Sequence, residues 1–144
     1  MEIKIKRVDQ SLPLPEYKTK GAAAFDLSAR ETVRIPPREV KYIPLNVILE
    51  VPENSWVLLA PRSSTHKLGI TAANGIGIGD CDFCGENDEY HFAALNFTDK
   101  EVIIERGTRI AQMMILSYQQ MQFEEVKSFE QHKTRGGFGS TGMK

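Results

Sequence analysis

The apolar residues of this chain come in short runs, and Pro, Gly, Asn or Asp separates each run from the next. Runs of this length that are rich in Ile, Val, Leu and Tyr are typical of strands rather than of helices. A chain with many such runs is expected to form a sandwich, a barrel or a jelly roll. The pattern predicts about eight strands, over Ile3–Ile5, Thr32–Ile35, Val40–Val51, Ser55–Ala60, Tyr90–Phe97, Val102–Ile104, Arg109–Leu116 and Met121–Val126.

Ser63–Leu68 is the single segment that predicts a helix, because Ser63 and Ser64 can cap its start and Gly69 can end it. The 144 residues fit one domain with one core, which we expect to span residues 1–132. Residues 133–144 are rich in Gly and contain a single aromatic side chain, so they predict a mobile C-terminal tail.

The charges of the chain nearly cancel, with 18 Lys and Arg against 19 Asp and Glu and a net charge of −1. Such a chain produces no overall field that would attract a nucleic acid or an anionic membrane, so we expect it to bind neither. No apolar run reaches the roughly 18 residues of a membrane span, and no secretory segment is recognisable after Met1. The expected location is the cytoplasm.

The two cysteines, Cys81 and Cys84, lie too close in sequence to staple a fold, and we interpret them as reduced thiols in a loop. The same spacing is half of a zinc site, and His91 could supply a third ligand. No second pair of this kind follows, so the loop interpretation is favoured over the metal site.

Because the chain has almost no net charge, a site for a polyanion must be local, and Pro61–Ser64 is one candidate. There Arg62 stands beside the hydroxyls of Ser63 and Ser64 at the start of the predicted helix. Unsatisfied helix N–H groups and a guanidinium both suit a phosphate. The alternative is an ordinary helix cap with a surface arginine.

The Gly-rich segment Asn74–Gly85 is a second candidate, because its glycines let the backbone turn tightly or approach a ligand. Asp80 and Asp82 lie two residues apart, so in an extended segment both carboxylates would face one pocket as a water-activating base and its partner. The alternative is a hairpin turn with solvated acids.

The tail offers a third set of groups, with a cation at Arg135, an aromatic face at Phe138 and hydroxyls at Ser140 and Thr141. Backbone N–H groups unhindered by side chains could cradle phosphates there while the ring stacks on a base. A Gly-rich end is also compatible with simple disorder.

Together these segments resemble the trimeric dUTP pyrophosphatases, in a likeness that runs from Leu12 to Gly142. One block of this kind is weak support, whereas five blocks in the order of the family are specific. The blocks are Gly21–Leu27, Pro61–Ser64 with Gly69–Ile70, Asn74–Gly85, Gly107–Gln112 and Gly136–Gly142.

The resemblance implies an all-β subunit, a distorted jelly-roll barrel with one short helix, that assembles as a homotrimer. It implies shared active sites in which the tail of one chain closes a pocket made by the others. The implied reaction is hydrolysis of dUTP to dUMP and pyrophosphate by water attack on the α phosphorus, which limits uracil in DNA and supplies dUMP for dTMP synthesis. Magnesium is the implied cofactor, held mainly by substrate phosphates and water, with no protein ligand.

The resemblance also assigns roles to individual residues. Asp80 is expected to be the general base that deprotonates the attacking water, and Asp26 to hold the catalytic site in shape. The ring of Phe83, where the family usually has a Tyr, is expected to lie against the deoxyribose and to exclude a ribose hydroxyl. The other expected substrate-binding residues are Arg62, Ser63, Ser64 and Gln112 toward the phosphates, Asn74, Gly77 and Asp82 around the uracil, and Arg135, Phe138, Gly139, Ser140 and Thr141 in the closing tail.

Three features depart from the family pattern. Gly79 stands where the family carries an aliphatic residue, which predicts a looser loop before the catalytic acid. About three extra residues, within Glu86–Glu89, add acidic charge near the expected triphosphate. Arg135 lies closer to Phe138 than the family's arginine does, so either Arg135 or Lys133 can fill its role.

Two other functions are compatible with this scaffold. A dCTP deaminase needs a glutamate on the strand before Asn96, where this chain has Ala93, and its tail normally lacks the Gly-rich block. A non-catalytic nucleotide sensor could dispense with the base, yet this chain retains Asp80. Both features favour the dUTP-hydrolysing enzyme.

Overall fold

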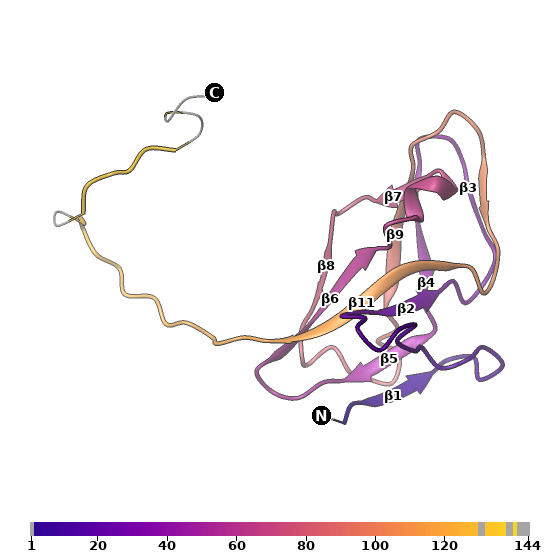
Figure 1. Ribbon diagram of the computed structural model, residues 1–144, viewed down its shortest axis with the longest axis horizontal. Helices are drawn as coiled ribbons and strands as arrows, with labels where there is room; N and C mark the ends of the chain where they lie inside the picture. Colours follow the sequence, from indigo (N-terminus) through magenta and orange to yellow (C-terminus); the bar gives the residue numbers. More distant parts are fainter. Residues whose placement is uncertain (1, 130–131, 138–139, 141–144) are drawn as a thin grey trace.

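The structure is a computed structural model that describes residues 2–129, 132–137 and 140, and its regular elements are almost all strands (Figure 1). The one helical element among these residues is the 3-10 turn η1 (Thr65–Leu68). The predicted all-β class is therefore confirmed. The strands are β1 (Lys4–Arg7), β2 (Phe25–Ser28), β3 (Val33–Ile35), β4 (Val40–Pro44), β5 (Val47–Glu50), β6 (Ser55–Pro61), β7 (Ile70–Ala72), β8 (Gly77–Gly79), β9 (His91–Asn96), β10 (Val102–Ile104) and β11 (Arg109–Ser117).

The strands pair antiparallel with partners that are distant in the sequence. The largest sheet has the order β2-β11-β6-β8, and a second sheet has the order β4-β9-β7. Two shorter ribbons, β1-β5 and β10-β3, complete the barrel. Long connections between strands that are neighbours in space are characteristic of jelly rolls, so this arrangement agrees with the predicted fold.

One hydrophobic core lies between the sheets. Alternate residues of β6 face it, with Val57 and Leu59 buried. Met113 from β11 and Phe92 from β9 join the same cluster. Each such side chain contributes roughly 1.5–3 kcal/mol when it leaves water, and their shared cluster fixes the two sheets against each other.

Strand β11 brings distant parts of the chain to one place. It pairs with β6 on one side and β2 on the other, so Gln112 lies opposite both Ala60 and Asp26. A register shift between Arg109 and Ala111 interrupts the pairing with β2, as a β-bulge does. Bulges re-aim side chains, and this one lies beside the polar cluster described below.

The strand predictions needed three corrections. The segment Val40–Val51 forms two strands, β4 and β5, because the chain turns at Asn46 with a φ of 68°. Strands β2, β7 and β8 were not predicted, since each is short and β8 contains two glycines. Met121–Val126 was predicted as a strand but has no regular structure, because no strand edge of the same chain lies beside it (Figure 1).

The predicted helix is shorter than expected. Only Thr65–Leu68 is helical, and the capping position Ser64 makes no side-chain hydrogen bond to the turn. Gly69 ends the turn with a φ of 80°, as predicted, because a residue without Cβ adopts this conformation easily. None of the helical residues that the structure describes forms a segment long and apolar enough to cross a membrane.

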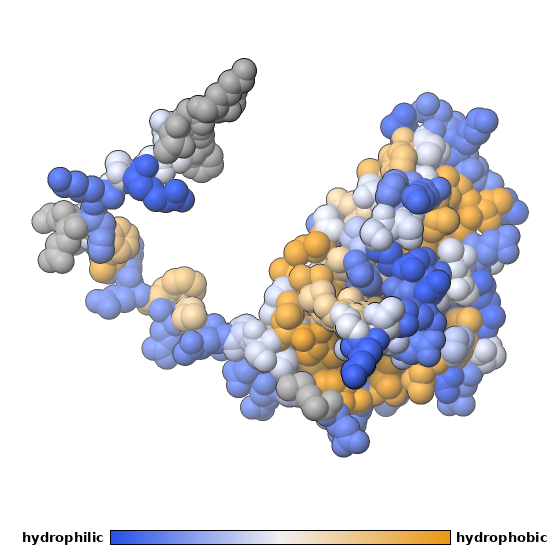
Figure 2. Space-filling model, viewed as in Figure 1, coloured by the Kyte–Doolittle hydropathy of each residue, from blue (hydrophilic) through white to orange (hydrophobic). Residues whose placement is uncertain are grey.

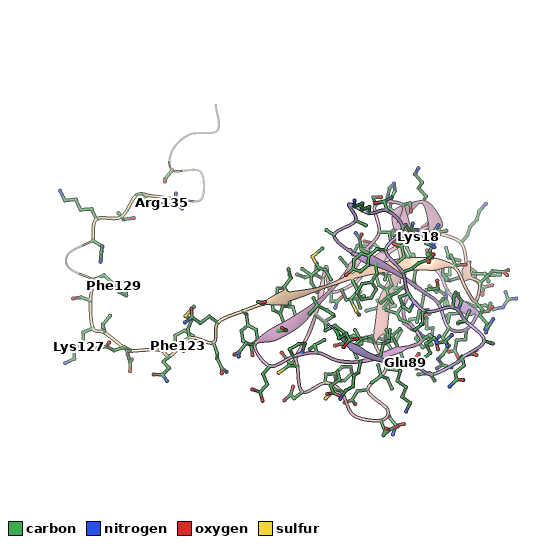
Figure 3. The ribbon with its side chains drawn as sticks, turned by 60° about the horizontal axis from the view of Figure 1, so that its bottom comes forward. Lys18, Glu89, Phe123, Lys127, Phe129 and Arg135 are labelled. Carbon is green, nitrogen blue, oxygen red and sulfur yellow. The ribbon has the colours of Figure 1, made fainter. Side chains whose placement is uncertain are left out.

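After Ser117 the chain leaves the barrel as an extended arm, which we define as residues 118–129 and 132–137 (Figures 1 and 2). Its side chains face solvent, and Phe123 is 98% exposed. Figure 3 shows Phe123, Phe129 and Arg135 along this arm, away from the body of the molecule. The arm therefore presents aromatic side chains that its own barrel does not cover.

Candidate active site

Asp26 on β2 joins two arginines. Its carboxylate accepts the Nε–H of Arg62 at 2.9 Å and a hydrogen of Arg109 Nη1 at 2.8 Å. The Asp26 side chain is only 15% exposed, and the Arg62 contact is partly buried while Arg109 reaches the carboxylate from the solvent side. Because two guanidinium groups share one carboxylate, this Asp26 cluster keeps one net positive charge and can attract an anion.

Neighbouring groups hold the same cluster in place. Arg62 Nη1 donates to the backbone oxygen of Arg109 at 3.3 Å and lies 3.4 Å from the Ser64 hydroxyl. Gln112 donates to the backbone oxygen of Pro61 at 3.0 Å. Arg62, Ser64, Gln112 and Asp26, which were predicted as site residues from separate parts of the sequence, therefore meet at one place, and Ser63 lies exposed between Arg62 and Ser64.

A second group of predicted residues surrounds a cavity of about 340 Å³. It lies at the end of β8, which pairs with β6 so that Gly77 lies opposite Leu59. A Cβ at Gly77 would lie 3.2 Å from Leu59 Cβ, so glycine lets the two strands approach closely. The cavity, named here the β8 cavity, has Asn74, Gly77, Gly79, Asp80, Phe83 and Tyr90 among its lining residues.

The chain turns immediately after β8. The Phe83 N–H donates to the Asp80 backbone oxygen at 3.2 Å, and this turn sets Asp80 and Phe83 on the wall of the β8 cavity. The segment is thus not extended here, and the prediction that Asp80 and Asp82 face one pocket is wrong. Asp82 lies exposed within the turn and does not line the cavity.

The two groups are separate within one chain. No residue of the Asp26 cluster lines the β8 cavity, and among the described residues no Arg or Lys lines it. A cavity without a cation suits an uncharged ring better than a triphosphate. One described chain therefore offers an anion-attracting cluster and a small-molecule cavity at different places.

Cys81 and Cys84 are free thiols, in agreement with the prediction. His91 Nδ1 lies 2.8 Å from the backbone oxygen of Glu89. Within residues 2–129, 132–137 and 140, no three His, Cys, Asp or Glu side chains gather as metal ligands. Both cysteines lie in the loop that follows β8, as predicted.

The acidic insert is anchored to the barrel. Glu86 forms an ion pair with Lys6, and Asp88 accepts the Gly85 N–H at 2.7 Å. Glu89 accepts from Arg30 Nε at 2.8 Å and from the Asn46 N–H at 2.8 Å. Each of these carboxylates is thus engaged in a contact that holds the longer hairpin, which explains how an acidic loop is tolerated here.

The tail residues are described only in part. Arg135 is exposed on the arm, and the Ser140 N–H donates to the Gly137 backbone oxygen at 2.9 Å. Phe138, Gly139 and Thr141, which were predicted to contact the substrate, lie outside the described residues.

Sequence reasoning missed two residues at these places. Arg109 was part of the fourth block but was given no role, although it shares the Asp26 carboxylate. Tyr90 was interpreted only as the start of a strand, yet it lines the β8 cavity beside Asp80. The position of Arg109 next to the block's glutamine was a usable signal, whereas nothing in the sequence pairs Tyr90 with Gly79.

The fold and the two sites define a jelly-roll protein with an anion-attracting cluster and a separate small-molecule cavity. A family model described as dUTPase matches residues 10–142. The deoxyuridine 5'-triphosphate nucleotidohydrolase of Dictyoglomus turgidum is 37% identical over 149 residues, covering 99% of each chain. The chain belongs to the dUTPase family.

Solved structures share the fold. A mutant dUTPase of Staphylococcus bacteriophage 80alpha, solved with dUpNHpp, superposes with a TM-score of 0.85 at 24% identity and covers 98% of both chains. A mutant dUTPase from phage phi11 of S. aureus, in which a structural Mg(II) ion is coordinated, gives a TM-score of 0.79 at 20% identity, covering 90% of this chain and 99% of that one. At these identities the likeness concerns the fold alone.

Proposed function

We propose that this protein hydrolyses dUTP to dUMP and pyrophosphate and that Asp80 is the general base of the reaction. Membership of the dUTPase family supports the activity. The observation that carries the assignment of residues is the place of Asp80 on the wall of a cavity that also contains Asn74 and Phe83. A carboxylate there can take the proton of a water that attacks the α phosphorus.

The β8 cavity is the proposed site of the deoxyuridine. The Asn74 side chain and the free backbone groups of the turn after β8 would pair with the polar edge of uracil. A fixed hairpin discriminates strongly, since a base with the wrong pattern of donors leaves buried groups unpaired. The ring of Phe83 would lie against the deoxyribose and leave no room for a 2′-hydroxyl.

The Asp26 cluster is the proposed site of the phosphates. Its net positive charge and the guanidinium of Arg62 suit phosphoryl oxygens, with Ser63, Ser64 and Gln112 as further hydrogen-bond partners. In this proposal Asp26 does not touch the substrate. It fixes the direction of two arginines that do.

Because the cluster and the cavity are apart within one chain, we propose that one active site uses residues of different copies in a homotrimer. The arm supports this arrangement, since it extends away from its own barrel with its aromatic side chains exposed (Figure 3). It would carry Phe138, Gly139, Ser140 and Thr141 to a neighbouring copy, with Arg135 or Lys133 near the γ phosphate. A closing tail would also exclude bulk water during the reaction.

Magnesium fits this site as a companion of the substrate. The described residues gather no set of three metal-ligating side chains, and magnesium characteristically keeps several waters and binds through phosphate oxygens. When bound in this way, the ion would neutralise charge on the phosphate chain. The protein's own contribution is then to hold the nucleotide, to orient the water and to accept its proton at Asp80.

Pyrophosphate release from dUTP, dCTP, dTTP and UTP, in magnesium and then in excess chelator, tests this function. Release from dUTP alone that depends on magnesium supports the proposal. Tight binding of dUTP without release would favour a nucleotide sensor, and release of ammonia from dCTP would favour a deaminase. Either result would overturn the proposed reaction.

A further inference from the structure

Tyr90 occupies the space that a side chain would take at Gly79, the residue before Asp80. A Cβ at Gly79 would lie 2.5 Å from Tyr90 Oη and 2.7 Å from Tyr90 Cε1. Gly79 does not have a positive φ, so its backbone conformation does not require glycine. The absence of a side chain at position 79 therefore serves to make room for the Tyr90 ring.

The backbone of Tyr90 is fixed on both sides. Its N–H donates to the backbone oxygen of Val47 at 3.0 Å, and its own oxygen accepts the Leu45 N–H at 2.9 Å. The residue is only 7% exposed. A ring held this firmly can serve as a support for its neighbours.

The neighbour that the ring supports is Phe83. The two rings meet edge to face, with centroids 5.2 Å apart and an angle of 77° between their planes. Such pairs contribute about 0.5–1.5 kcal/mol beyond the burial of their surface. Phe83 is itself 39% exposed and lies in a turn, so its contact with the buried Tyr90 ring restrains the direction of its own ring.

The Tyr90 hydroxyl has no hydrogen-bond partner, and it is the only buried side-chain nitrogen or oxygen without one in the part of the chain that the structure describes. An unsatisfied buried group costs about 1–3 kcal/mol, which a phenylalanine at this position would avoid. Burial raises the pKa of Tyr90 to about 12, helped by the charges of Asp80, Cys84 and Asp88, so the phenol keeps its proton. The hydroxyl is thus buried against Gly79, where the ring has no polar contact that holds it.

We propose that Tyr90 is a positioning residue that sets sugar selectivity, because its ring holds Phe83 behind the deoxyribose. This inference rests on the proposed function of the β8 cavity. At Gly79, a large residue that directly precedes β9 occupies the space of a side chain missing from β8. The loop before Asp80 is packed rather than loose.

Binding of the α,β-imido analogues of dUTP and UTP, measured by calorimetry on the full-length protein in magnesium, tests the inference without any turnover. Tyr90→Leu removes the support of Phe83, so the preference for the deoxynucleotide analogue should fall by about tenfold. Tyr90→Phe keeps the ring that contacts Phe83, so it should retain the preference. An unchanged preference in Tyr90→Leu, or a preference lost in Tyr90→Phe, would overturn the inference.

A second set of variants distinguishes the role of Tyr90 from a folding defect in Tyr90→Leu. Gly79→Ala should displace Tyr90 and lower the preference, and the double variant Gly79→Ala with Tyr90→Leu should bind better than Gly79→Ala alone, since the clash is relieved. Thermal unfolding of each free protein accompanies the measurement. A merely structural tyrosine would lose stability in Tyr90→Phe, whereas the unsatisfied hydroxyl predicts a free protein at least as stable as the wild type.

Failure of this inference is distinguishable from failure of the proposed function. If the wild type releases pyrophosphate from dUTP and Tyr90→Leu still prefers the deoxynucleotide analogue, only the inference fails. If the wild type binds the analogues selectively but releases no pyrophosphate, the proposed reaction fails while the comparison of analogues still decides the role of Tyr90.

Discussion

The carboxylate of Asp26 accepts the Arg62 Nε–H at 2.9 Å, and this contact ties β2 to the loop that follows β6. Arg109 donates to the other oxygen of the same carboxylate. One partly buried acid therefore directs two cations, and the phosphate-binding geometry that we propose depends on its charge. This dependence can be tested without removing a group that touches the substrate.

Asp26→Asn should lower kcat/KM for dUTP by about tenfold or more, because charged hydrogen bonds of about 1.5–3 kcal/mol are replaced by weaker ones and the two arginines then repel. Steady-state pyrophosphate release measures the loss. Asp99→Asn is the matched control, since Asp99 also pairs with an arginine, Arg38, at 2.8 Å but lies exposed at the surface. Equal losses in both variants would contradict a specific role for Asp26.

Asp80→Asn should retain nucleotide binding and lose turnover by a factor of about 10² or more, since the amide has a similar shape but cannot accept the water's proton. Single-turnover pyrophosphate release beside calorimetric binding separates the two effects. A smaller loss is expected for Asp82→Asn, because that carboxylate does not line the β8 cavity. A larger loss in Asp82→Asn would show that the wrong acid has been assigned.

Strong local patterns predicted most of the barrel. Strand β6 was found because Ser55–Ala60 contains a short apolar run, whereas β8 was missed because Gly77 and Gly79 have low strand propensity and indicated a turn. Met121–Val126 carries a strand pattern but finds no partner edge in its own chain. Local sequence reports propensity, and pairing decides which segments become strands.

Contacts between distant residues explain what the sequence could not predict at the site. The cluster of Asp26, Arg62 and Gln112 was anticipated only through family resemblance, because its members lie far apart until β11 joins β2 and β6. The anchoring of Glu89 by Arg30 links positions 59 residues apart. Gly79 was recognised as unusual from the sequence, but only the structure identifies Tyr90 as the residue that fills its place.

Deleting residues after Lys133 should abolish most turnover while the barrel remains folded, because the arm leaves the barrel after Ser117 (Figure 1). Far-UV circular dichroism and gel filtration check the fold, and dUTP turnover checks the site. Loss of the fold would contradict the separation of barrel and tail.

Active sites that are shared between copies predict that two inactive variants complement each other. The truncated chain lacks a tail and the Asp80→Asn chain lacks a base, so each alone should be nearly inactive. Refolding the two together should restore part of the turnover, since some mixed assemblies combine an intact Asp80 with an intact tail. Activity no higher than the sum of the separate preparations would contradict sites shared between copies.

The raised pKa of Tyr90 predicts a loss of folding stability at alkaline pH. Its pKa is raised to about 12 in the folded protein, against about 10 for an unfolded chain, mainly because the phenol is buried. As pH rises, the unfolded chain loses this proton first, because the pKa of the tyrosine is lower there. The protonated phenol therefore contributes fully to folding stability below about pH 10, and this contribution is lost between about pH 10 and 12.

Tyr90→Phe should therefore show a smaller decline of its thermal unfolding midpoint than the wild type between pH 10 and 12. Tyr42→Phe is the matched control, because Tyr42 lies mostly in solvent and should leave the decline unchanged. The same decline in wild type and Tyr90→Phe would mean that the buried phenol does not resist ionisation.

The central claim is that this chain directs a water to the α phosphorus of dUTP. Hydrolysis of dUTP by the wild-type protein in water enriched in ¹⁸O, followed by mass spectrometry of both products, tests it most directly. The account predicts that the heavy oxygen appears in dUMP and that pyrophosphate stays unlabelled. Label in pyrophosphate, or no consumption of dUTP in the presence of magnesium, would contradict it.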